Sequence, residues 1–110
     1  MPRPSAPANV LASDGLPTVI ITWDAVTGAG SYTVYRSAEQ YDGYYTIART
    51  DELTWDDTTA VLGVVYWYGV SVTLASGGGC SVMSTPDNGY ASQEPLSAPA
   101  APTFLEATVI

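Results

Sequence analysis

The sequence contains neither histidine nor lysine, and it has a single cysteine. Without histidine, the Ser/His/Asp and Cys/His arrangements of nucleophilic enzymes and the familiar zinc sites cannot be assembled. Cys80 has no partner thiol in the chain, so no internal disulfide can form. These absences predict a protein that is not an enzyme and that requires no cofactor.

Positive charge is also scarce. The three arginines are Arg3, Arg36 and Arg49, and they stand against eleven acidic residues, so the formal net charge is −8. Nucleic acid is not expected as a partner, because phosphate binding needs a basic stripe. Membrane insertion is not expected either, because no run approaches the roughly 18 apolar residues of a membrane span. The N-terminal residues lack the apolar stretch of a signal peptide.

Hydrophobic residues, by contrast, are plentiful. They make up 46% of the 110 residues, and the aromatic residues are eight tyrosines, three tryptophans and one phenylalanine. This length and composition predict one domain with a real core. No segment shows a sustained helical period, whereas several alternate with the period of a strand. We therefore expect an all-β protein.

The longest uninterrupted β pattern covers residues 63–72, and we expect it to form the central strand. Its large residues recur at every second position and so share one face: Val64, Tyr66, Tyr68, Val70 and Val72. Residues 18–24 place Val19, Ile21 and Trp23 on one face in the same way, and a third strand carries Tyr32 and Val34. Further strands are expected near residues 10–12, 45–50, 53–57 and 82–90.

Turn residues separate these strands. Asp14-Gly15 and residues 76–79, Ser-Gly-Gly-Gly, predict chain reversals. Pro86 and Asp87-Asn88-Gly89 are expected to bend or interrupt the last strand. About seven short strands at this spacing are typical of an antiparallel β-sandwich.

Both ends of the chain are rich in proline and alanine. Residues 1–6 are interpreted as a linker, 7–92 as the domain, and 93–110 as a linker with the start of a following repeat. The repeat is inferred because residues 102–108 echo residues 7–13. We expect the apolar segment 104–110 to pair with the edge of a sheet.

Several of these residues follow the pattern of fibronectin type III domains, which the chain resembles over about residues 5–92. The pattern is met in order along the chain by five groups of residues: Trp23; Tyr32-Thr33-Val34; Trp55-Asp56-Asp57; Gly63, Tyr66, Tyr68 and Val70; and Gly79, Ser81 and Ser84. The chain departs from it at Ala60, where the family has a leucine that plugs a corner, and Leu62 is expected to fill that gap. Val72 replaces a small alanine, and the Arg-Gly-Asp loop is absent.

The resemblance implies an immunoglobulin-like sandwich of three plus four strands without disulfides, usually repeated in tandem. It implies that Tyr66 forms a tyrosine corner, with its hydroxyl bonded to backbone in the preceding loop. Trp23, Tyr32, Trp55 and Tyr68 are likewise assigned structural roles. In bacteria such modules connect catalytic and carbohydrate-binding domains or build surface proteins, which implies an extracellular or cell-surface location.

Two aromatic residues are candidates for ligand binding. Trp67 points away from Tyr66 and Tyr68, and Tyr35 occupies the same outer face on the neighbouring strand, near Tyr41, Tyr44 and Tyr45. Adjacent exposed rings stack on sugar rings. The alternative is a cross-strand pair that only stabilises the sheet, by roughly 0.2–1 kcal/mol.

Two other features are expected to be structural. Asp51, Glu52, Asp56 and Asp57 form the only cluster with enough oxygens for Ca²⁺, but turn formation explains it better than a cation site. Cys80 is expected to be a small buried residue, since no cation lies nearby to make it reactive.

Two functions remain open. The first is a non-catalytic spacer and interaction module of a multidomain protein, with the neighbouring domains of its own chain as partners. The second is a module that binds a polysaccharide or a protein through the aromatic outer face.

Overall fold

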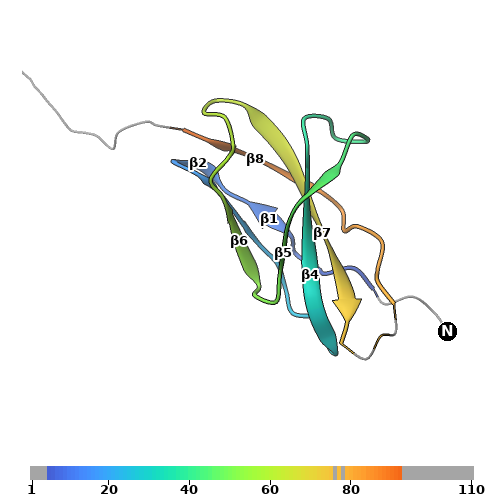
Figure 1. Cartoon of the computed structure of the whole chain (residues 1–110). Coiled ribbons are helices and arrows are strands. Elements are labelled where there is room, and N and C mark those ends of the chain that lie inside the picture. The colour runs from blue at the N-terminus through green and yellow to red at the C-terminus, as the bar shows by residue number, and fades with distance from the viewer. Residues whose placement is uncertain (1–4, 76, 78, 93–110) are drawn as a thin grey trace, which may run out of the picture.

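The computed structural model describes residues 5–92 apart from 76 and 78. Over this part the protein is an all-β sandwich of two sheets, which confirms the expected fold class (Figure 1). The eight strands are β1 (Leu11–Ala12), β2 (Asp14–Leu16), β3 (Val19–Thr22), β4 (Ala29–Ser37), β5 (Tyr45–Thr50), β6 (Thr54–Asp57), β7 (Val65–Leu74) and β8 (Asp87–Ala91).

One sheet has the order β1-β3-β6, and the other has the order β2-β8-β7-β4-β5. All neighbours are antiparallel except β2 and β8. The segment expected to form the central strand is β7, which lies in the middle of the larger sheet. Among the described residues, no helix is long and apolar enough to cross a membrane.

The core lies between the two sheets and follows the alternation of the sequence. The hydrophobic residues with no exposed surface come from strands of both sheets: Val19, Ile21, Val34, Tyr68, Val70, Val72 and Ala91. Val10, Ala12, Trp23 and Tyr32 also belong to this core. Val64 was expected to join it, but it precedes β7 at the end of the sandwich and is 37% exposed.

The sheets hold three and five strands, where the resemblance implied three and four. The extra strand is β2, at the position of the predicted Asp14-Gly15 turn. Instead of reversing there, the chain leaves β1 and pairs with the end of β8 in the other sheet, with Asp14 opposite Tyr90. Gly15 has a φ of 84°, a conformation that favours glycine, and the register shifts at this point.

Asp87-Asn88-Gly89 is not a turn either, because these residues form most of β8. The strand does begin directly after Pro86, as a proline that cannot donate to the ladder requires. Gly89 allows the backbone of β8 to lie close to Ser13, because a β-carbon at this position would lie 2.5 Å from the Ser13 carbonyl oxygen. The sequence signal for a turn was therefore a signal for contact between backbones.

The glycine-rich reversal falls partly on Ser76 and Gly78, which lie outside the described residues. Around it, the Leu74 N–H donates to the Gly79 carbonyl at 3.0 Å. The predicted edge pairing of residues 104–110 and the predicted repeat also lie outside the described part. Figure 1 shows the segment before β1 and the end of β8 at opposite ends of the sandwich.

Candidate functional site

The predicted aromatic site lies on the outer face of the larger sheet. Tyr35 of β4 pairs with Gly69 of β7, and Trp67 pairs with Ser37, so the two rings are diagonal neighbours on one face. Both side chains are half-buried. The Tyr35 hydroxyl lies 2.9 Å from the Ser71 hydroxyl on the same face and shares a hydrogen bond with it. One polar group of this face is thus already engaged within the domain.

Two neighbours cover part of this face. Met83 lies over Gly69, where a β-carbon would be 2.5 Å from its Sδ, so the glycine makes room for the methionine. Ser37, opposite Trp67, is buried by the loop that follows β4, and its hydroxyl donates to the Asp42 carbonyl at 2.6 Å. The two rings therefore do not form a bare flat platform. Sequence reasoning did not find Met83.

A group of polar side chains joins the two sheets. Their contact was not predicted from the sequence. Arg36 of β4 and Asp57 of β6 form an ion pair, with Nη1 and Oδ2 separated by 2.9 Å. Their side chains are 12% and 2% exposed. Arg36 also donates from Nε to the Tyr45 hydroxyl at 2.9 Å and lies 4.4 Å above the Tyr66 ring centroid. The pair connects strands that belong to opposite sheets.

The Asp57 carboxylate has four donors around it. The Tyr68 hydroxyl donates to Oδ2 at 2.8 Å, and Thr59 donates to Oδ1 from its N–H at 3.0 Å and from its hydroxyl at 2.7 Å. The fourth is Arg36. Burial alone would raise the pKa of Asp57, but these hydrogen bonds outweigh burial and hold its pKa below the usual value. Burial and the bond to Asp57 raise the pKa of Tyr68.

The lowered pKa of Asp57 predicts a loss of stability in acid. The unfolded chain takes up this proton near pH 3.9, roughly the ordinary pKa of an aspartate, and the folded chain only at lower pH. The stabilisation is complete above that value and falls as the pH drops through the folded pKa. Urea unfolding from pH 7 to pH 2 should therefore show the difference in unfolding free energy between the natural protein and Asp57→Asn shrinking in acid. A difference that stays constant over this range contradicts the assignment.

The residues assigned structural roles lie around the core. Trp23 contacts Tyr32, with ring centroids 5.6 Å apart, and the Tyr32 hydroxyl accepts from the Val26 N–H at 2.9 Å. The Tyr66 hydroxyl accepts from the Val61 N–H in the preceding loop at 3.3 Å. Trp55 shares the face of Ile21 but lies on the edge strand β6, and it is 36% exposed.

Leu62 does not fill the corner left by Ala60, because it is 46% exposed. Ala60 itself packs against the core. The same corner contains the Arg36 guanidinium, which lies over the Tyr66 ring. Leu62 thus does not replace the leucine that the family has at the position of Ala60.

The expectation that Cys80 is buried is wrong, because its side chain is exposed. Cys80 forms only an isolated bridge with Thr73. The next residue, Ser81, takes the inward position, where its N–H donates to the Val72 carbonyl at 2.8 Å and its hydroxyl accepts from the Val72 N–H at 3.0 Å. The strand alternation then turns Cys80 outward.

The acidic cluster is divided by the fold. Asp56 and Asp57 are consecutive in β6 and point to opposite faces, and Asp57 is engaged by Arg36. Within the described ranges, no group of three or more acidic or cysteine side chains is arranged to hold a metal ion.

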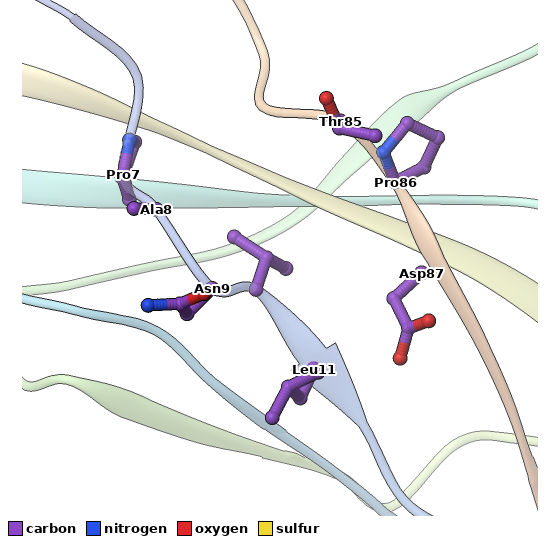
Figure 2. A pocket seen from close by; sticks show the side chains of 8 residues that line it. Pro7, Ala8, Asn9, Leu11, Thr85, Pro86 and Asp87 are labelled. Atoms are coloured by element: carbon purple, nitrogen blue, oxygen red, sulfur yellow. The ribbon is translucent and has the colours of Figure 1, made fainter.

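A hollow of about 350 Å³ lies between the chain before β1 and the segment before β8. Pro7 and Asn9 border it on one side, and Thr85 and Pro86 on the other (Figure 2). Asp87 is the one ionisable residue in its lining, and its Oδ2 accepts from the Ala12 N–H at 2.8 Å. A single carboxylate that is already hydrogen-bonded does not make an acid–base pair.

The two-sheet fold defines the class of protein, an immunoglobulin-like sandwich, and the single cysteine of the chain means that no internal disulfide joins the sheets. No family model matches the chain. A solved relative, an Fn3-like protein from Clostridium thermocellum, is 30% identical with a TM-score of 0.64, and the match covers 87% of this chain and 97% of that one. The chain belongs to the fibronectin type III-like family.

Two curated relatives match shorter stretches. An amylopullulanase of Thermoanaerobacterium saccharolyticum is 35% identical over 69 residues, which are 62% of this chain and 5% of the enzyme. A tail tube protein of Bacillus phage SPP1 is 48% identical over 40 residues, which are 36% of this chain and 15% of that protein. The chain thus spans a small part of the curated relatives it matches, and domains of this kind occur within larger multidomain chains.

Proposed function

We propose that this domain is a non-catalytic spacer in a multidomain extracellular or cell-surface protein. The observation that carries the proposal is that the segment before β1 enters at one end of the sandwich and β8 ends at the other (Figure 1). Each module of this shape adds its own length to a chain. The ten residues of β7 correspond to roughly 33 Å at the rise of a strand.

Three features support this role. The buried pair of Arg36 and Asp57 links the sheets and resists their separation. The matches to part of an amylopullulanase and part of a tail tube protein support a position within a longer chain. The partial cover over Tyr35 and Trp67, and the engaged Tyr35 hydroxyl, favour a spacer over a sugar-binding face.

Chains of one, two and three copies joined end to end test the proposal. Small-angle X-ray scattering should show a maximum dimension that grows by a constant increment of at least ~33 Å per copy. Growth that falls off with each copy contradicts the spacer. In a parallel amide NMR titration with soluble plant and bacterial polysaccharides, the signals of Tyr35 and Trp67 should not shift at millimolar ligand. Shifts confined to these residues would instead support the binding module.

A further inference from the structure

The end of the sandwich where β8 leaves carries a group of exposed aliphatic side chains. We call it the exit collar, and it consists of Leu16, Val61, Leu62, Val64 and Val65. Their exposed fractions range from 37% for Val64 to 57% for Val61. Figure 1 shows β2, the loop before β7 and the end of β8 together at this end. Exposed aliphatic side chains gathered at one end of a domain are typical of a contact surface.

Hydrogen bonds hold the collar around the departing chain. The Gly63 N–H donates to the Ala91 carbonyl at 2.8 Å, which fixes the loop between Val61 and Val64 against the end of β8. On the other side, the Ser92 N–H donates to the Leu16 carbonyl at 2.7 Å. Val65 pairs with Tyr90. Ala91 and Ser92 are therefore hydrogen-bonded to the two halves of the collar.

We propose that the exit collar is the docking surface for the segment that follows it, residues 93–99, with Leu96 as the anchoring side chain. Leu96 is the one large aliphatic residue between Ser92 and Pro102. It lies four residues past Ser92, so it stays within roughly 14 Å of that residue even at full extension. Its side chain matches the aliphatic collar in chemistry, and its neighbours Glu94 and Ser97 are polar.

The flanking prolines lower the entropic cost of this contact. Pro95 precedes Leu96 directly and Pro99 follows three residues later. Each fixes one backbone angle and reduces the conformations that docking must give up. A flexible linker of glycine and serine would lose more freedom on docking. The sequence after Ser92 is thus suited to a defined path.

A second copy of the chain fits the collar less well. Ala91 bonds to Gly63 and Ser92 bonds to Leu16, so a partner that covered both halves of the collar would meet the end of β8 between them. Leu16 also borders a hollow of about 270 Å³ with Leu11 and Ile20, which extends the apolar surface next to the collar. The docked segment would fix the direction in which the proposed spacer continues.

The docking of Leu96 would set the direction in which the proposed spacer continues. It is measured on a single chain, so its outcome does not depend on the scattering of joined copies. The experiment compares amide NMR spectra and relaxation of the natural chain, Leu96→Ser and the matched control Leu105→Ser. In the natural chain, Leu96 should be as rigid on the picosecond to nanosecond timescale as the sandwich. Leu96→Ser should abolish this rigidity and shift the amides of the five collar residues.

Hydrogen exchange supplies a second measurement. The Gly63 amide, which bonds to Ala91 in the collar, should exchange about tenfold faster in Leu96→Ser, because the loop loses apolar cover. Leu105→Ser should leave the collar amides and this exchange rate unchanged. A flexible Leu96 in the natural chain overturns the proposal, as does a collar that responds to Leu105→Ser instead. If the amide shifts of the collar change with protein concentration and are the same in Leu96→Ser, the occupant is a second copy. That result also overturns the proposal.

Discussion

Replacing Asp57 by alanine should lower the free energy of unfolding by about 3–5 kcal/mol. The change removes the carboxylate but leaves the Arg36 guanidinium 12% exposed at the junction of the sheets. It also removes the acceptor of the Tyr68 hydroxyl, which belongs to a side chain with no exposed surface. The main cost is thus the burial of a charge and a hydroxyl without their partner. Urea unfolding at pH 7 measures it.

Asp56→Ala is the matched control, because Asp56 is the exposed neighbour of Asp57 in the same strand. It should change the unfolding free energy by no more than about 0.5 kcal/mol. The double replacement Arg36→Met with Asp57→Leu removes both charges, so it should recover the part of the lost stability that comes from the unpaired charge, while the Tyr68 hydroxyl still lacks its acceptor. If Asp57→Ala costs no more than Asp56→Ala, the ion pair does not hold the sheets together.

The sequence contains a signal for one half of the ion pair, the inward position of Arg36, but not for its partner. Arg36 continues the inward series of Tyr32 and Val34, and Asp57 pairs with Val19 on the inner face of β3 and β6. An arginine at an inward position of a strand requires a carboxylate that also faces inward. The sequence does not give the pairing of β3 with β6, so it does not say which of the acidic residues meets Arg36. Asp57 was therefore grouped with its neighbours in sequence.

Alternation alone predicted most of the core, Val64 excepted, because the period of a strand assigns each side chain to a face once the strand is known. Alternation did not predict the structure where a strand changes its pairing partner. β2 crosses to the larger sheet at Asp14, and Cys80 faces outward because Ser81 bonds to Val72 on the inner side. Both depend on which backbone groups lie next to each other, which local sequence does not determine. The burial of Ser37, opposite Trp67, by the loop after β4 has the same cause.

Gly89 is the sharpest case of such a contact between backbones, and Gly89→Ala should destabilise the protein by about 1–3 kcal/mol. The new β-carbon would lie 2.5 Å from the Ser13 carbonyl oxygen and 2.8 Å from the Ala12 β-carbon. Ser13 cannot easily move away, because its carbonyl accepts the Tyr90 N–H at 3.1 Å. The clash therefore separates β8 from the chain that joins β1 to β2. Urea unfolding and the exchange rate of the Tyr90 amide report it.

Gly69→Ala is a matched control within the same sheet. Its β-carbon would also meet atoms at 2.5 Å, but these are Cγ and Sδ of Met83, a flexible side chain on the outer face. Methionine has several rotatable bonds and adapts to a neighbour at little cost. Outside a steric conflict, a glycine to alanine change stabilises by about 0.4–1 kcal/mol through the unfolded chain. Gly69→Ala should therefore cost clearly less than Gly89→Ala. Equal losses would mean that backbone contact at Ser13 is not what requires a glycine in β8.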